Sequence, residues 1–529
     1  MKRLRLATAA AVGLIGASLA SRVQAESADN NEAEIALLKQ QLRLMEQKLD
    51  KLQKQTAANT AAAAHANAKA DAKLGVANAN ANAAYPVKGP VAPFGAVVTM
   101  PNNRPTICTV DNENCISLTS RVHWDVGGYN YRPDSAATSP QKLDSGENLR
   151  RARIGVIGKF LGDWNYALIY DFGGSSDGFG GAAAGSLPGG GVSGVEQAYL
   201  SYTGFRPFGG KLAIEGGVQD LAWTLDEATS SNDIIFMERA SPGVIAQNVA
   251  AGDFRSSAGA RWYNDQFWVG SYITGPQTGA LHSASSAAPA GTSEQYGAIA
   301  RAAGQVVSGK DYSLHIGGDA EVLIQPPHNL VATPQTAAAQ TFTLSDRPEL
   351  RIDPTTLVSA AVPGTSQIQV YGAEAAATYG PLLFQGEYYW FDVERNFIVS
   401  LPSLRFQGGY AEASYVLTGE THTYNPATAA YSGVAPANPF SLEHGGWGAW
   451  EIAARYSTIN LNDQLANANG LAGGRQDMYT LGLNWYVSRN IRFMLNYLHG
   501  DISKQLSPTN STDTGAKFDA VAMRTQVAF

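Results

Sequence analysis

The chain ends in the stretch Phe518-Asp-Ala-Val-Ala-Met-Arg-Thr-Gln-Val-Ala-Phe529, in which apolar and polar side chains alternate. Successive side chains of a β-strand point to opposite faces, so this stretch predicts a strand with one apolar and one polar face. The apolar face would carry Val521, Met523, Thr525, Val527 and Phe529, and the polar face Ala522, Arg524, Gln526 and Ala528. A last strand that ends on an aromatic residue is typical of a transmembrane β-barrel, although strands of soluble sheets alternate in the same way.

The same alternation recurs along the region 117–529. Further strands with one apolar and one polar face are predicted at Lys211–Gln219, Tyr312–Val322, Trp450–Ser457 and Tyr479–Val487. Roughly four hundred residues of this kind are too many for one small soluble barrel, but they suit about 16 tilted strands of ~10 residues. A barrel of that width keeps an aqueous lumen, so charged side chains can face inward and stay hydrated. The sequence therefore predicts an all-β fold, a transmembrane antiparallel β-barrel.

Two further features fit a barrel in a membrane. Glycine-rich and proline-rich stretches such as 173–194 and 325–364 would form outer loops. Aromatic residues near the expected strand ends are candidates for girdles at the two membrane interfaces, although ordinary packing also explains them. They include Trp164, Tyr166, Tyr388, Tyr389 and Trp390.

The composition excludes two other classes of protein. The chain has 529 residues, of which 44% are hydrophobic and 55 are glycine, and its formal net charge is -7. No apolar run approaches the ~18 residues of a transmembrane helix, which excludes a helical membrane protein. An acidic balance without a basic patch gives no electrostatic footprint for nucleic acid.

The amino terminus predicts export through a cleaved signal peptide, residues 1–25. Three basic residues among the first five positions precede an apolar stretch from Ala7 to Ala20 and then Val23-Gln-Ala25, a small-x-small cleavage pattern. A membrane anchor is the alternative, but the apolar stretch is shorter than the ~20 residues that a spanning helix needs. The mature chain would therefore begin near Glu26, outside the cytoplasm.

Two segments separate the signal peptide from the barrel. Residues 26–56 predict a short coiled coil, because apolar residues recur with three-four spacing from Ile35 to Leu52. A coiled coil of roughly three heptads is only marginally stable by itself, so this segment would rely on an oligomer held together by other parts of the chain. The alternative is a single amphipathic helix. Residues 57–116, rich in alanine, asparagine and proline, predict a linker. Near its end, Cys108 and Cys115 are expected to form a disulfide in an oxidising compartment rather than stay free thiols.

Six short strings along the predicted barrel are of a kind shared within one protein family. They are Leu149-Arg-Arg-Ala-Arg-Ile-Gly-Val156, Glu227–Arg239, Tyr415–Glu420, Gly448–Tyr456, Leu481–Tyr486 and Arg524–Phe529. In this order they make the chain similar to the phosphate-selective porin O and P family of Gram-negative outer-membrane porins. The resemblance implies a homotrimer of 16-stranded barrels in outer-membrane lipid, with a pore narrowed by an inward-folded loop around Thr224 to Val249. It also implies that Phe529 belongs to a signal read by the barrel assembly machinery.

Charged residues on the predicted polar faces are the candidate site residues. Family members that capture phosphate line the pore with arginines and a few lysines, and cationic side chains lower the barrier to anions. The basic candidates are Arg121, Arg151, Arg153, Lys159, Lys211, Arg261, Arg455, Arg492 and Arg524, with Arg239 in the candidate loop. Acids share the same faces at Asp125, Glu215, Asp319, Glu321 and Glu451, and the loop carries Asp226, Glu227, Asp233 and Glu238. Mixed charges give weak selectivity unless the signs segregate.

Two details bear on the solute. The stretch Gly217-Val-Gln-Asp-Leu-Ala-Trp223 stands where the family typically has Gly-x-Phe-Lys-x-Pro, and exchanging a lysine for Asp220 argues against a dedicated phosphate site. Arg151 and Arg153 would present two charges to the lumen ~6–7 Å apart. They would either handle anions or bridge to lumen carboxylates, and the sequence leaves both open.

The sequence thus predicts a porin through which small hydrophilic solutes or ions diffuse passively, with no cofactor, metal or nucleic-acid partner, and it leaves open whether anions or phosphate are preferred. An enzyme is not expected, because the chain lacks Gly-x-Ser-x-Gly, His-Glu-x-x-His and phosphate-loop motifs. A structural barrel that tethers the envelope through its coiled coil, or an outer-membrane barrel enzyme, are the alternatives.

Overall fold

The computed structural model describes residue 48 and residues 95–134, 142–173, 194–252, 255–277 and 293–529. The chain divides into two compact units, Met1–Gly89 and Pro90–Phe529. The predicted signal peptide, the coiled coil apart from Lys48, and most of the linker lie outside the described residues. No helix in the described ranges is long and apolar enough to cross a membrane.

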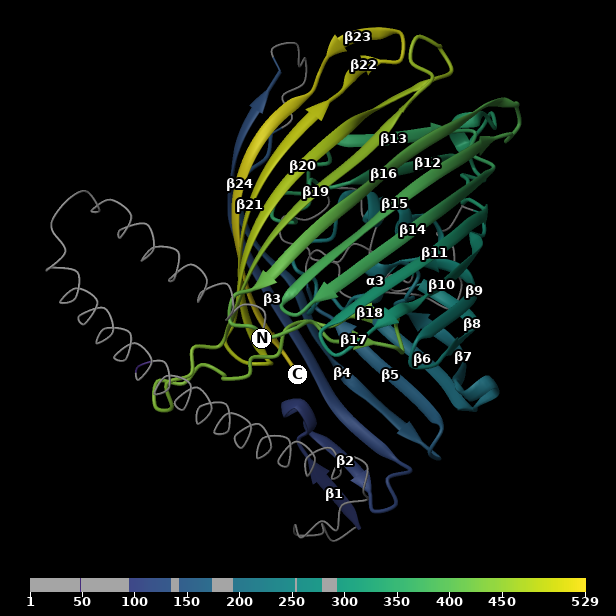
Figure 1. Ribbon diagram of the computed structural model, residues 1–529. Coiled ribbons are helices and arrows are strands. Elements are labelled where there is room, and N and C mark those ends of the chain that lie inside the picture. Colours follow the sequence, from purple (N-terminus) through teal and green to yellow (C-terminus); the bar gives the residue numbers. More distant parts are fainter. Residues whose placement is uncertain (1–47, 49–94, 135–141, 174–193, 253–254, 278–292) are drawn as a thin grey trace, which may run out of the picture. The chain divides into compact units, whose positions relative to one another are not determined.

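The second unit is a closed antiparallel β-barrel (Figure 1). Its main sheet has 18 described strands, of which β1 and β2 form a short extension while the other 16 form the barrel. The ring closes where β24 pairs with β3, so the expected 16-stranded barrel is confirmed. The barrel strands are β3 Cys115–Pro133, β4 Gly146–Phe160, β5 Trp164–Asp171, β6 Gly194–Phe205, β7 Lys211–Gln219, β8 Arg255–Tyr263, β9 Phe267–Gln277, β10 Tyr296–Ser308, β11 Tyr312–Gln325, β14 Gln367–Tyr379, β15 Leu382–Arg395, β16 Leu401–Val416, β19 Ala449–Asp463, β20 Leu471–Tyr486, β21 Ile491–Ser503 and β24 Ala516–Ala528.

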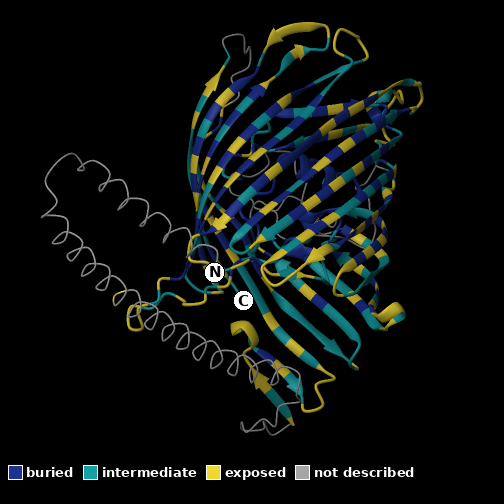
Figure 2. Ribbon diagram, in the orientation of Figure 1, coloured by how far each residue is buried: buried dark blue, intermediate teal, exposed yellow. Residues whose placement is uncertain are grey.

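Buried and exposed residues alternate along the barrel strands (Figure 2), and the exposed face is the apolar one, the inverse of a soluble barrel. On β24, Val521 and Val527 are exposed on the outside, whereas Ala522 and Arg524 are buried inside. On β15, Trp390 faces outward but Tyr389 is fully buried in the lumen, so the prediction that Tyr389 belongs to an interface girdle is wrong. Neighbouring strand residues must point to opposite faces, and only one of the two can face lipid. The outer surface is therefore apolar, as a membrane barrel requires.

The segment between β7 and β8 folds into the barrel. It contains helices α3, Leu225–Ala228, and α4, Ser241–Ala250, and α3 is visible behind the strands in Figure 1. Thr224 begins α3 because its side chain accepts a hydrogen bond from the backbone N–H of Glu227 at 3.0 Å. Nine of the ten residues of α4 are buried, so this helix packs within the barrel and not in water. We call residues 220–252 the constriction loop.

Two other connections also reach inward. The connection between β11 and β14 carries β12, Thr341–Asp346, and β13, Val358–Pro363, and its residues Glu349 and Arg351 are buried inside the barrel. This corrects the expectation that 325–364 is only an outer loop. The connection 417–448 carries β17, Tyr424–Asn425, and β18, Ala430–Tyr431. Although it is long, 417–448 lies at the same end of the barrel as the short turns 161–163 and 487–490, and short turns are periplasmic, so it enters from the periplasmic end. The remaining elements are β22 Gln505–Ser507, β23 Asn510–Asp513 and the short 3-10 helices η1 Pro101–Asn103, η2 Pro207–Gly209 and η3 Ala337–Ala339.

The end of the expected linker is not a linker. Strands β1, Ala96–Thr99, and β2, Thr106–Thr109, form a hairpin that extends β3, and Cys108 and Cys115 are joined by a disulfide. Val97, Val98 and Ile107 are β-branched and favour strands, but the prolines around them obscured this signal.

Candidate pore constriction

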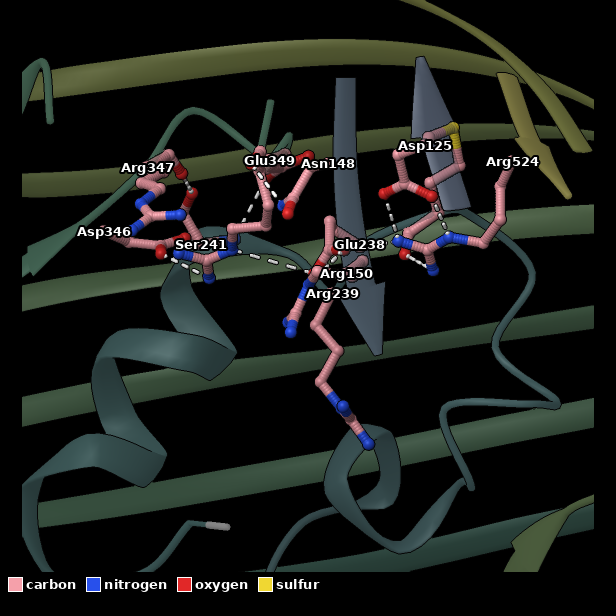
Figure 3. A network of polar contacts seen from close by, with 12 residues as sticks. Asp125, Asn148, Arg150, Glu238, Arg239, Ser241, Asp346, Arg347, Glu349 and Arg524 are labelled. Atoms are coloured by element: carbon pink, nitrogen blue, oxygen red, sulfur yellow. Dashed lines mark hydrogen bonds and ion pairs between the residues drawn. The ribbon is translucent and has the colours of Figure 1, made fainter. Parts of the chain in front are cut away.

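Glu238 of the constriction loop is the centre of a buried ionic network (Figure 3). Arg150 of β4 donates to its two carboxylate oxygens at 2.8 and 3.0 Å, and Arg524 of β24 donates to it at 2.6 Å. Arg524 also donates to both oxygens of Asp125 on β3, at 2.6 and 2.7 Å. Burial alone would raise the pKa of Glu238, but Arg150, Arg524 and Arg151 hold that pKa well below its usual value. A charged Glu238 therefore fastens the loop to this wall of the barrel.

Three more predicted arginines also hold the loop. Arg239 donates to the backbone oxygens of Asp226 at 3.1 Å and Thr229 at 2.9 Å, and it forms an ion pair with Glu227 at 3.3 Å. The other two belong to the barrel wall. Arg455 donates to the carbonyl oxygen of Glu238 at 2.9 Å and to Glu349 at 2.7 Å, and Arg492 donates to the carbonyl oxygen of Ile234 at 2.8 Å. Their charges are engaged in anchoring the loop.

Two acids of the constriction loop behave unlike Glu238. Burial raises the pKa of Asp226, although Arg239 lies 3.8 Å away, and burial likewise raises the pKa of Asp233. These two carboxyl groups hold their charge less firmly than Glu238 does.

A β-bulge brings three arginines of β4 to the lumen. The register between β3 and β4 shifts so that His123 pairs with Arg151 and Trp124 with Leu149, which leaves Arg150 as the extra residue. Arg150 and Arg151 are therefore both buried inside, and strict alternation missed Arg150. Arg153 binds Asp171 at 2.8 Å and also Glu196. Arg151 differs, because its Nε and Nη1 atoms are buried and have no hydrogen-bond partner among the described residues.

The remaining predicted basic residues are more peripheral. Arg261 forms an ion pair with Glu215 at 3.1 Å. Lys159 is half-buried on β4, and Lys211 is exposed at the first position of β7. Arg121 of β3 donates to the hydroxyl of Ser231 at 2.5 Å. The predicted basic residues therefore share the lumen face but do not form one continuous row of unpaired charges.

The charges of the lumen segregate by strand. Strands β3, β4, β21 and β24 form one side of the lumen, which we call the cationic wall, and its buried acid is Asp125. Its inward arginines are Arg121, Arg150, Arg151, Arg153, Arg492 and Arg524. The strands β11, β14, β15 and β16 form the acidic wall, with the buried residues Asp319, Glu321, Glu374, Glu387 and Glu412. In the order of the 16 barrel strands, β3 and β11 lie on opposite sides of the ring. Segregation of the signs is the condition under which mixed charges can select an ion.

A cavity of about 480 Å³ opens at the periplasmic end, beside the carboxy-terminal residue Phe529. Its charged side chains are Arg104, Arg121, Arg489 and Arg492, against the single acid Asp233. The sequence did not single out Arg104 or Arg489, because the first lay in the expected linker and the second lies in the turn between β20 and β21. The mouth of the barrel is therefore predominantly cationic.

A closed barrel with an apolar outside and a charged lumen narrowed by an inward loop defines a porin-type barrel of the outer membrane. The family model for "Phosphate-selective porin O and P" matches residues 116–529, so the chain belongs to this family. The family and the barrel place the protein in the Gram-negative outer membrane.

Two relatives match part of the sequence. An uncharacterized protein of Caulobacter vibrioides is 34% identical over 151 residues, which cover 28% of this chain and 28% of the relative. Porin O of Pseudomonas aeruginosa is 28% identical over 164 residues, which cover 30% of this chain and 35% of the relative. In each case the match spans well under half of the relative's own length.

Solved outer-membrane barrels are also similar to the chain. The outer-membrane protein OmpT of Vibrio cholerae is 11% identical, with a TM-score of 0.43 over 79% of this chain and 98% of its own. The outer-membrane channel DcaP of Acinetobacter baumannii is 8% identical, with a TM-score of 0.42 over 78% and 97%. OprB of Pseudomonas putida is 9% identical, with a TM-score of 0.43 over 78% and 94%.

Proposed function

We propose that the protein is a passive diffusion pore of the outer membrane for small hydrophilic solutes, with a preference for anions. It is not an enzyme and uses no cofactor, and three copies assemble into a homotrimer, as the family resemblance implies. The observation that carries the anion preference is the periplasmic cavity, where four arginines face one aspartate. Positive potential in a narrow aqueous path raises the local concentration of anions and lowers their barrier.

Arg151 supports the same proposal from inside the barrel. It is 1% exposed, and two of its guanidinium nitrogens have no hydrogen-bond partner in the described part of the chain. Buried guanidinium N–H groups without an acceptor are costly, and a passing anion would supply one. Its neighbours Arg150 and Arg153 are already paired with carboxylates, so Arg151 is the residue of β4 that we assign to anion handling.

We assign no dedicated phosphate site to this pore. Phosphate capture needs several cations that converge on one anion, and here most lumen arginines are engaged by carboxylates or by the constriction loop. Asp220 adds a negative charge near the start of the loop, where the family typically has a lysine.

The test is the reversal potential of the purified protein in a planar bilayer under a KCl gradient, repeated with added phosphate. We expect anion preference in the wild type, a clear loss of that preference in Arg151→Ala, and no change in Arg405→Ala. Arg405 is a matched control, because it is 80% exposed on the opposite face of β16. Cation preference in the wild type would contradict the anion assignment, and block by micromolar phosphate would contradict the absence of a phosphate site. Absence of stepwise conductance would contradict the pore itself.

The trimer is tested separately. Light scattering of the protein in detergent should give a protein mass of about three chains. A mass of a single chain would refute the homotrimer while leaving the pore assignment intact.

A further inference from the structure

Three carboxylates of the acidic wall converge at one point. Asp319 of β11, Glu374 of β14 and Glu387 of β15 lie on three consecutive strands, and one oxygen of each lies within 4.8 Å of the others. All three side chains are buried. Like charges at this distance repel strongly where water is excluded, so the cluster is stable only when protons or a cation neutralise part of its charge.

The partners within the protein compensate only part of this charge. Arg301 binds Glu374 through Nη2 at 2.9 Å, and the ring of His315 contacts the same carboxylate at 2.9 Å. Glu387 accepts hydrogen bonds only from neutral donors among its described partners, namely two backbone N–H groups of α3 and the hydroxyl of Tyr410. Among the described residues, the cationic contacts of the cluster therefore go to Glu374 alone.

Asp319 is the carboxylate of the cluster whose oxygens have no partner among the described residues. The residue is only 7% exposed. The other two carboxylates do have partners, so Asp319 alone of the three has two unused acceptors, and at least one of them lies in the cluster. An unsatisfied buried carboxylate is costly, and a bound cation is one of the few groups that satisfy it.

Two glycines leave room for these carboxylates. A Cβ atom at Gly372 would lie 2.2 Å from Oδ1 of Asp319, and a Cβ atom at Gly317 would lie 2.2 Å from Oε1 of Glu374. Any larger residue would displace the two oxygens. The backbone therefore approaches closely at the positions where the carboxylates turn toward one another.

We propose that Asp319, Glu374 and Glu387 form a binding site for one hard divalent cation, with Ca²⁺ as the best fit. All three ligands are oxygens, which selects hard cations over zinc or copper. Ca²⁺ binds oxygens at about 2.3–2.6 Å, so two of its ligands can be up to ~5 Å apart, whereas the shorter bonds of Mg²⁺ require a tighter cluster. A carboxylate has about four lone-pair positions, so Glu374 and Glu387 can bind the ion and keep their present partners.

The site would connect the wall to the constriction loop. Glu387 accepts from the backbone N–H groups of Leu225 at 2.8 Å and Asp226 at 3.0 Å, which are the first residues of α3. Trp223, just before α3, donates to the carbonyl oxygen of Ala320, the residue after Asp319, at 3.1 Å. A bound ion would therefore fix the start of the loop and reduce the negative potential of the acidic wall.

The test is equilibrium dialysis with radioactive Ca²⁺ on the full chain refolded in detergent free of lipopolysaccharide, after treatment with EGTA. We expect saturable binding of about one ion per chain at or below ~1 mM. Affinity should fall at least ~10-fold in Asp319→Asn. It should stay within about twofold in Glu412→Gln, which removes a buried charge of the same wall but lies outside the cluster and is bonded to Gln385.

A second variant covers the case in which Asp319→Asn fails to fold. Gly372→Ala keeps all three carboxylates but places a methyl group against Asp319, so it should also weaken Ca²⁺ binding. Folding of each variant is checked by heat-modifiable mobility on gels. Absence of saturable binding by the folded wild type, or equal losses in Asp319→Asn and Glu412→Gln, would overturn the proposal. Because binding is measured in detergent without any current, its failure would leave the pore assignment untouched.

Discussion

The substitution Glu238→Gln should release the constriction loop from the cationic wall. Glu238 accepts from Arg150 at 2.8 and 3.0 Å and from Arg524 at 2.6 Å, and it is 4% exposed. Glutamine keeps one acceptor oxygen but turns the other into an NH₂ group that faces guanidinium donors. Two buried arginines would then lack their shared counter-charge.

The free-energy cost of Glu238→Gln follows from the charge-assisted hydrogen bonds that Glu238 accepts. Hydrogen bonds to charged groups contribute about 1.5–3 kcal/mol each, and removing one partner of a buried ionic group costs about 3–5 kcal/mol. Since Asp125 still binds Arg524, we take the lower end, about 3 kcal/mol. Every 1.4 kcal/mol is tenfold, so opening of the loop should become roughly 150-fold more frequent.

Hydrogen exchange of amides within residues 225–250 measures this opening directly. Protection there should fall by roughly two orders of magnitude in Glu238→Gln, while the barrel strands keep their protection. The control is Glu443→Gln, which makes the same chemical change at an exposed position of the periplasmic connection. If loop protection is unchanged in Glu238→Gln, or falls equally in the control, the network does not hold the loop and our reasoning is refuted.

Three further outcomes are expected. Burial alone would lower the pKa of His422, but Glu451, at 2.7 Å, raises it. This ion pair therefore stabilises the segment 422–434 at low pH, and the stabilisation is lost as the pH rises through the raised pKa. Proteolysis of 422–434 should increase between pH 6 and 9 in the wild type but not in His422→Gln. Replacing Cys108 and Cys115 by serine should cost about 2–3 kcal/mol locally and expose the β1–β2 hairpin to protease, with unchanged heat-modifiable mobility because the hairpin lies outside the ring. Val521→Arg, on the exposed face of β24, should destabilise the barrel in urea titrations in lipid by about 2–4 kcal/mol, whereas Val521→Leu should not.

The sequence predicted the barrel well because lipid and lumen impose opposite demands on alternate residues. The registers read from Tyr312–Val322 and Trp450–Ser457 place Asp319 and Arg455 inside, as the structure has them. Alternation failed at Arg150, because a bulge depends on the pairing of two strands and leaves no mark in one of them. It also missed the inward path of 422–434, since that segment is held by contacts to distant strands, such as Tyr431 to Ser313.

The candidate site could be predicted only as a list of charges. Which carboxylate meets which arginine depends on closure of the ring: Asp125 and Arg524 are 399 positions apart, and Glu238 and Arg524 are 286 apart. No spacing rule joins residues at such separations. The division into a cationic and an acidic wall likewise appears only once the strands are ordered around the barrel.

The arginines that anchor the constriction loop belong to the same set that could select anions, so the pairing of each arginine determines whether it contributes to selectivity. An arginine that shares its charge with a buried carboxylate contributes little net potential to the pore, as Arg153 does beside Asp171. Arg524 is similarly engaged by Asp125 and Glu238. Net positive potential therefore concentrates at Arg151 and at the periplasmic cavity, not evenly along the cationic wall. Selectivity should accordingly respond to substitutions of Arg151 and of the arginines of the periplasmic cavity, whereas substitutions in the Glu238 network should alter the stability of the open path.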